Sequence, residues 1–243
     1  MDSRELNQSL PSRPSEAKFL TKSEKDWITT QLKGEEVHKD QTHQISAAGA
    51  LVHGRVWHLA GTAMFHGAVS YAIFFWMPQI VKALSSSGYA NTVVGFLVMI
   101  PYLVGLPAMI LISRRSDRML ERRWHVAIPA MIGGLAAVMR GVAHSIVVSV
   151  VLLSAVVACV CAYLGPFWAL PSEFLRGSSA ASGIALITTF VNVGGFIGPY
   201  AAGFIRQKTG SLYGAFAVAG IVLFVFATLV LMLSKEARVP ASG

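Results

Sequence analysis

The sequence predicts an all-α integral membrane protein with six transmembrane helices. Of its 243 residues 54% are hydrophobic and 13% are charged, whereas about 25% are charged in soluble domains. The charges are also segregated, because six long runs contain no Asp, Glu, Lys or Arg. These runs are 56–81, 89–113, 124–139, 141–172, 177–205 and 209–234. Crossing a hydrocarbon core of ~30 Å takes about 20 helical residues, and each run reaches that length with at most a short extension. A soluble fold with six buried helices would need a large polar shell, which this composition does not supply.

The N-terminal segment, residues 1–54, is polar and is predicted to be cytoplasmic. Thr21 and Glu24 have capping-box spacing, and an apolar stripe after them stops before Gly34. This pattern predicts a short amphipathic helix near 21–33. The stripe consists of Trp27, Ile28 and Leu32. Such a helix can lie on the membrane surface or against the ends of the bundle, or it can be a partly formed helix within a linker.

The six predicted spans together make a bundle over residues 55–235, followed by a cytoplasmic tail at 236–243. Short connections between them predict that sequential helices are antiparallel neighbours. The spans are placed at Val56–Leu84, Thr92–Ser113, Trp124–Ala143, Ile146–Leu170, Ser178–Ile205 and Leu212–Ser234.

The distribution of Lys and Arg predicts the orientation. With the N-terminus inside, sixteen of the 20 basic residues lie on the cytoplasmic side and four lie outside. Without the long N-terminal segment, eight basic residues lie on the cytoplasmic side and four outside, which favours the same orientation. Both counts place the two termini in the cytoplasm of a multi-pass protein of the plasma or inner membrane. The net charge of +8 is explained by this asymmetry and does not indicate nucleic-acid binding.

A charged segment between the second and third spans carries the most specific motif. Residues 114–123 read RRSDRMLERR, with five arginines and two acids. Together with Ser113 they resemble the G-x-x-x-D-R-x-G-R-R loop of the major facilitator superfamily, which lies between the second and third helices of each six-helix half. Ser113 and Leu120 stand where that motif has glycines, which leaves open whether this loop makes the tight turn of the motif.

Four further segments are similar to the C-terminal half of the anion:cation symporter family, which includes tartrate and phthalate permeases. They are 10–28, 121–130, 166–175 and 183–211. The resemblance implies alternating-access transport of small organic anions such as carboxylates, coupled to protons or sodium. It also implies a partner in the lipid bilayer, either an N-terminal six-helix half or a second copy of the chain. The alternative function is a truncated, transport-incompetent half with a structural or association role.

The motif residues Asp117, Arg118, Arg122 and Arg123 form, by this resemblance, a conformational latch. The alternative is a charge cluster that only sets the topology. No enzyme, cofactor or metal site is predicted, because no constellation of His, Asp and Glu has catalytic or metal-ligand spacing. Cys159 and Cys161 are two residues apart on one helix, so they point away from each other.

The predicted substrate lining is neutral, because none of the six charge-free runs contains a carboxylate. His66 and Ser70 are four residues apart and share a helix face, as do Thr188 and Asn192. Tyr71 is either a pocket aromatic or a lipid-facing one, and His66 is either a site residue or a hydrogen-bonded packing residue. The family resemblance implies that the fourth span also lines the cavity. Its candidates are Tyr163, Phe167 and Trp168.

A cluster of helix breakers lies on the fifth span. Pro199 removes a helical hydrogen bond just after three glycines, so a bend is expected there. The alternative is close packing, since small residues let membrane helices approach each other. The cluster consists of Gly194, Gly195, Gly198 and Pro199.

Overall fold

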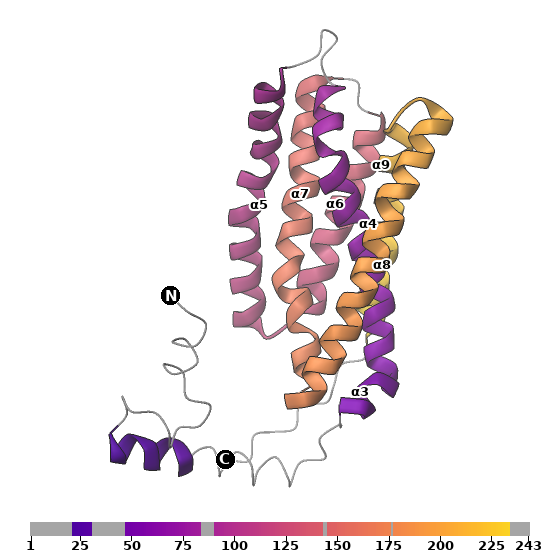
Figure 1. The fold of residues 1–243 in the computed structure, drawn as a ribbon. Coiled ribbons are helices and arrows are strands. Elements are labelled where there is room, and N and C mark those ends of the chain that lie inside the picture. The colour runs from indigo at the N-terminus through magenta and orange to yellow at the C-terminus, as the bar shows by residue number, and fades with distance from the viewer. Residues whose placement is uncertain (1–20, 31–46, 84–89, 143–144, 176, 234–243) are drawn as a thin grey trace, which may run out of the picture. The chain divides into compact units, whose positions relative to one another are not determined.

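A computed structural model describes residues 21–30, 47–83, 90–142, 145–175 and 177–233. Six long helices lie side by side in a bundle that belongs to the compact unit Ser46–Gly243 (Figure 1). Its elements are α3 (Ala47–Val52), α4 (Gly54–Lys82), α5 (Asn91–Met119), α6 (Arg123–Val142), α7 (Ile146–Ala169), the 3₁₀ turn η2 (Pro171–Glu173), α8 (Gly177–Thr209) and α9 (Tyr213–Met232).

The six long helices confirm the predicted fold class. Each is long and apolar enough to cross a membrane, which follows from the charge-free runs of the sequence. Five of the six contain proline. Neighbouring helices can satisfy the backbone groups that a proline frees in a membrane, so these helices continue through it. The described residues contain no β-strand.

Three of the four main helix pairs are not sequential neighbours. The most extensive packing joins α4 to α8, α5 to α7, and α6 to both α7 and α9. By contrast, α5 and α6 barely touch although only three residues connect them. The expectation that sequential helices are neighbours is met by α6 and α7 but was wrong for α5 and α6, and also for α7 and α8, which share no extensive packing. Both α5 and α6 pack on α7 instead, which leaves a gap between them.

Glycines bring α4 and α8 into close contact. A Cβ atom at Gly67 would overlap the Val191 carbonyl group, and one at Gly198 would overlap the backbone of Ala68. Gly194 faces Met64 in the same way. Within the described chain α8 continues through the proline from Gly177 to Thr209. The structure therefore gives the glycines a packing role, and the bend stays a prediction.

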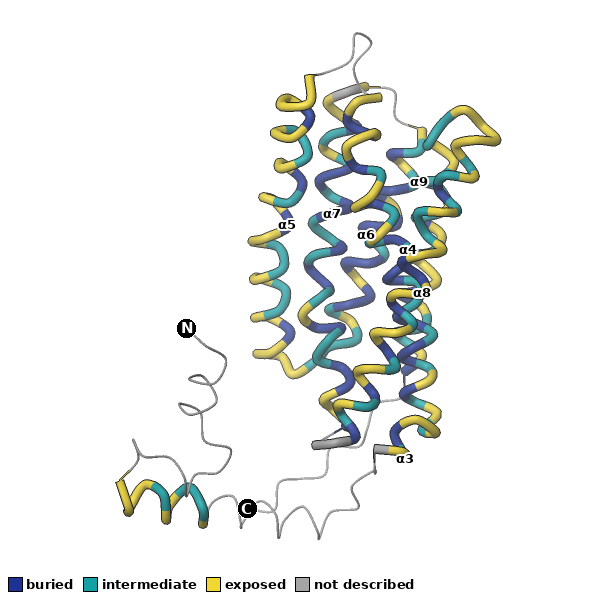
Figure 2. The backbone as a smooth tube through the Cα atoms, viewed as in Figure 1, coloured by how far each residue is buried: buried dark blue, intermediate teal, exposed yellow. Residues whose placement is uncertain are grey.

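Two helices are the least buried of the six spans. They are α5 and α8, and Figure 2 shows exposed residues along the outer side of α5. The exposed side chains are mainly large and apolar, among them Phe96, Leu103, Phe196 and Tyr200. In a membrane such faces contact lipid or another helical unit.

The predicted charged loop is mostly helical. Because α5 runs to Met119, the four charged residues before it lie on the last turns of the helix. The turn itself is short and uses Leu120 at φ 48°, in the left-handed region. The Leu120 N–H bonds to the Asp117 carbonyl group and the Glu121 N–H to that of Ser116, which is a Schellman motif. The tight turn therefore forms without its glycine.

The other departure from the motif is accommodated by the neighbouring helix. Ser113 lies on α5 directly against Gly165 of α7, where any Cβ atom would overlap its hydroxyl group. Because small residues permit close approach between membrane helices, a glycine on α7 leaves space for the serine on α5.

The polar unit Met1–Ile45 contains a helix at 22–30. At its start the Thr21 N–H donates to Glu24 Oε2 over 2.9 Å, and the Thr21 hydroxyl group donates to the same oxygen over 2.7 Å. These bonds hold the pKa of Glu24 below its ordinary value. Trp27 is 66% exposed. The end of the predicted helix at 31–33 and the predicted tail at 236–243 lie outside the described residues.

Candidate functional site

A pocket of about 400 Å³ lies between α4, α5 and α7. Four of its side chains carry polar hydrogen-bonding groups, namely those of His66, Ser70, Tyr71 and Tyr102. The remaining lining is Ile73, Phe74, Val157, Val160, Cys161 and Leu164. Ligand pockets are typically apolar with a few convergent polar groups, and this pocket has that composition.

His66 stands at the inner wall of the pocket and is 4% exposed. Its Nδ1 atom lies 3.1 Å from the Tyr163 hydroxyl group and 3.1 Å from the Ser70 hydroxyl group. Rings of Tyr163, Phe167 and Phe226 surround the imidazole with centroids at 5.4, 5.6 and 6.1 Å. His66 is thus both a hydrogen-bonded packing residue and part of the pocket wall. The hydroxyl groups of Tyr163 and Ser70 together hold its ring in place.

Tyr71 joins the pocket to α8. Its hydroxyl group donates to Asn192 Oδ1 over 3.2 Å, and its ring covers Gly195, where a Cβ atom would lie 3.0 Å from the ring. The structure therefore brings two predicted site residues, Tyr71 and Asn192, into contact. Asn192 and Thr188 are exposed on α8 and do not line the pocket.

The predicted residues of α7 stand behind the pocket. Tyr163 and Phe167 are fully buried, and they support His66 from the side away from the pocket lining. Trp168 packs edge-on against Phe167 at 5.7 Å and does not line the pocket either. These three residues can position the site, but the surface a solute would meet comes from other positions on α7.

Sequence reasoning missed Tyr102 and Cys161, which line the pocket, and Phe226, which packs on His66. A signal existed for Tyr102, because a phenol in the middle of an apolar span is a polar group that needs a partner. No signal existed for Phe226, one of many apolar residues on α9.

The pocket lining contains no Lys, Arg, Asp or Glu among the described residues. It can donate hydrogen bonds and offer aromatic contact, but it cannot neutralise a charge. The described residues also contain no group of three His, Cys, Asp or Glu side chains that could hold a metal ion.

Two of the latch residues, Asp117 and Arg122, meet at the end of the bundle where α5 ends and α6 begins, here called the arginine end. Arg122 Nε lies 3.1 Å from Glu173 Oε1, and its Nη1 lies 3.6 Å from Asp117 Oδ1. Arg123 donates to the carbonyl groups of Leu231 and Leu233 at the end of α9. The arginines thereby tie the end of α5, the start of α6, η2 and α9 together.

Comparisons with known proteins agree with this architecture. The chain is 32% identical over 217 residues to a quinolone resistance transporter of Acinetobacter baumannii, covering 88% of this chain and 49% of the relative. It is 33% identical over 234 residues to a putative tartrate transporter of Agrobacterium vitis, covering 96% and 53%. A putative metabolite transport protein, NicT, of Pseudomonas putida is 31% identical over 230 residues, covering 93% and 52%.

The chain spans about half the length of the curated relatives it matches. The sequence model of the Major Facilitator Superfamily matches residues 10–199 and 59–243. With the six-helix bundle and the charged turn between its second and third spans, these matches show that the chain belongs to the Major Facilitator Superfamily.

Proposed function

We propose that this chain is the C-terminal half of a secondary transporter that carries small organic anions by alternating access, coupled to protons or sodium. The polar pocket between α4, α5 and α7 is the observation that carries this proposal. The names of two relatives, a putative tartrate transporter and a putative metabolite transport protein, support it. The proposal includes a multi-pass location in the cell membrane with both termini in the cytoplasm, in line with the Lys and Arg distribution.

The pocket chemistry suits one part of such a solute. Hydroxyl groups of Ser70 and Tyr102 and the His66 ring can donate to carboxylate oxygens, and the Tyr71 hydroxyl group can do so once its bond to Asn192 opens. A volume of about 400 Å³ is within the range of ~300–1,000 Å³ of small-molecule sites. Since the lining holds no Lys or Arg, the charge of an anion must be balanced by another unit.

A partner unit is therefore part of the proposal. The exposed apolar faces of α5 and α8 are the surfaces on which a second six-helix unit would pack. An N-terminal half that supplies cationic residues completes the site. A second copy of this chain would cover the same faces but would duplicate a lining without cations.

In this mechanism the two halves rock about a site near the middle of the membrane. The Tyr71–Asn192 hydrogen bond joins the pocket wall to an exposed face of α8, so a movement of α8 relative to α4 would open or close the wall. The ion pairs of Arg122 with Asp117 and Glu173 hold the arginine end in one access state, and Arg118 is exposed there for a contact with the other half.

The test is uptake of labelled organic acids into proteoliposomes, first with this chain alone and then with a candidate N-terminal half. We expect uptake only with both halves. Tyr71→Phe, Asn192→Ala and Trp168→Ala should each lower uptake, whereas Thr228→Ala, whose hydroxyl group bonds its own helix at Phe224, should not. Uptake unchanged by all three site variants would remove the proposed site.

A purely structural role, in which the chain folds or associates without moving a solute, is the second candidate. The lack of a cationic group in the pocket lining favours it. It predicts no uptake with any N-terminal half despite stable association of the two chains. Robust uptake by this chain alone would overturn it.

A further inference from the structure

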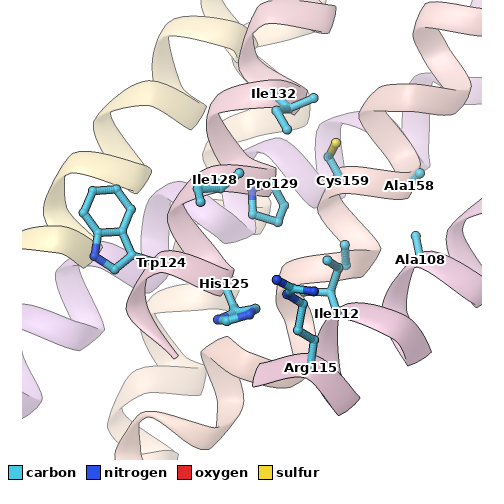
Figure 3. A pocket seen from close by; sticks show the side chains of 11 residues that line it. Ala108, Ile112, Arg115, Trp124, His125, Ile128, Pro129, Ile132, Ala158 and Cys159 are labelled. Carbon is cyan, nitrogen blue, oxygen red and sulfur yellow. The ribbon is translucent and has the colours of Figure 1, made fainter. Parts of the chain in front are cut away.

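A second pocket, of about 350 Å³, lies on another face of α7, between α5 and α6 (Figure 3). Cys159 lines it, whereas Cys161 lines the polar pocket, so α7 separates the two. We call this second pocket the α5–α6 groove. It is lined by Ala108, Ile112, Arg115, Trp124, His125, Ile128, Pro129, Ile132, Ala158, Cys159 and Ala162. The gap exists because α5 and α6 barely touch each other.

The groove is apolar along its length and cationic at one end. Figure 3 shows the Arg115 and His125 side chains together at that end, whereas the Trp124 ring projects away from them. Arg115 is exposed and makes no ion pair with any residue that the structure describes. Its guanidinium group is thus available for an outside anion.

The nearby carboxylate groups are already engaged. Glu121 Oε2 accepts from the Trp124 N–H over 2.9 Å and lies 3.3 Å from His125 Nδ1. Asp117 pairs with Arg122. Neither pairs with Arg115, and residues 114–123 contain five arginines against these two acids, so the mouth of the groove carries net positive charge.

The length of the groove limits what can fill it. Ala108 and Arg115 are seven residues apart on α5, as are His125 and Ile132 on α6, which corresponds to roughly 10 Å along each helix. This is about a third of a hydrocarbon core of ~30 Å. The groove therefore lies within one leaflet and starts at the arginine end.

We propose that the α5–α6 groove binds one anionic phospholipid of the leaflet at the arginine end. The headgroup phosphate lies on Arg115, and one acyl chain runs along Ile112, Ile128 and Ala158. Arginine binds phosphate oxygens through paired N–H groups, and basic residues next to a membrane attract anionic lipids. Trp124, half exposed at the mouth, stands where tryptophans meet the interface. This proposal does not depend on transport or on the substrate.

The full chain in lipid nanodiscs provides the test. Tryptophan fluorescence is quenched with brominated phosphatidylglycerol or brominated phosphatidylcholine, and the signal from Trp124 is taken as the difference from Trp124→Phe. We expect the anionic lipid to quench this signal preferentially. Arg115→Gln should weaken the preference about fivefold, the effect of one basic residue near an anionic surface.

Arg114→Gln is the matched control, because it removes the same charge from a neighbouring residue that does not line the groove. Ala108→Leu fills the apolar part without changing charge and should reduce quenching by both lipids. Equal quenching by the two lipids, or an equal loss in Arg114→Gln and Arg115→Gln, would overturn the proposal. So would undiminished quenching in Ala108→Leu, as expected if the groove holds protein rather than lipid.

If Trp124→Phe perturbs the fold, native mass spectrometry of the unmodified chain and of the two arginine variants replaces the optical readout. Preferential retention of phosphatidylglycerol by the wild type and by Arg114→Gln, but not by Arg115→Gln, supports the site. Equal retention by all three proteins contradicts it.

Discussion

The hydroxyl group of Tyr163 lies 3.1 Å from Nδ1 of His66 and thereby joins α7 to α4 behind the polar pocket. Both side chains are buried, so water cannot replace the bond. We expect Tyr163→Phe to lower the free energy of unfolding by about 1 kcal/mol, the usual size of such a bond in proteins and membranes. Thermal unfolding in detergent measures it.

Tyr200→Phe serves as the control for this prediction. Tyr200 is 70% exposed and its hydroxyl group has no hydrogen-bond partner among the described residues, so its removal should leave stability unchanged. Equal effects of the two substitutions would show that the Tyr163–His66 bond does not stabilise the bundle.

The glycine contact between α4 and α8 gives a second prediction. A Cβ atom at Gly198 would overlap the backbone of Ala68, and the backbone cannot rotate aside as a side chain can. Gly198→Ala should therefore destabilise the bundle by about 1–3 kcal/mol, the usual cost of overpacking. Gly61→Ala on α4 meets nothing within 4 Å and should be neutral or stabilising. If both variants unfold at the wild-type temperature, the two helices are not in close contact.

At Leu120, in contrast to Gly198, a substitution is expected to increase the free energy of unfolding. Leu120 adopts φ 48°, which costs an ordinary residue roughly 1–2 kcal/mol, whereas glycine loses only 0.5–1 kcal/mol of backbone freedom. Leu120→Gly should therefore stabilise the chain by about 0.5–1 kcal/mol. Met119→Gly, inside the last helical turn, should destabilise it. Chemical unfolding compares the two, and a loss of stability in Leu120→Gly would contradict the left-handed turn.

The Arg122–Glu173 ion pair can be measured with a double-mutant cycle. Single and double substitutions Arg122→Gln and Glu173→Gln should give a coupling energy below about 1 kcal/mol, because the carboxylate is partly exposed and screened. The coupling should shrink further at high salt. A coupling energy of zero at low salt would mean that the pair does not hold η2 to the start of α6.

The lowered pKa of Glu24 predicts that the stability of the helix at 22–30 depends on pH. Its hydrogen bonds from Thr21 lower its pKa, so they stabilise the helix start above the pKa that Glu has in the unfolded chain. That contribution is lost as the pH falls through the lowered pKa of the folded state. Carboxyl chemical shifts in NMR should show Glu24 titrating at lower pH in the wild type than in Thr21→Ala. Identical titration curves would rule out the capping interaction.

Spacing alone predicted that two of the pocket residues lie on one helix face. His66 and Ser70 share a face because four residues make about one helical turn, and the structure brings them together around one nitrogen atom. The same rule put Thr188 and Asn192 on one face of α8 but could not say what that face meets. Their exposure, and the bond from Tyr71 to Asn192, follow from how α4 and α8 pack.

The motif predicted the position of the charged turn along the chain but not its structure. Its register between the second and third spans was correct, but the extent of α5 through Asp117 and Arg118 depends on hydrogen bonds that end only at Leu120. Likewise, the fit of Ser113 against Gly165 requires knowing that α5 packs on α7.

By itself the sequence determined six membrane-length helices, the neutral character of their lining and the family to which the chain belongs. These properties depend on local composition, on helical period and on short motifs, which are all present in the linear order of residues. Only the tertiary structure decided that Tyr102 and Cys161 line the polar pocket, that Arg122 pairs with Glu173, and that α5 and α6 stand apart. These contacts depend on how each helix is rotated about its axis and on which helix it packs against. The hydrophobic periodicity of a single helix carries no information about such contacts between distant segments.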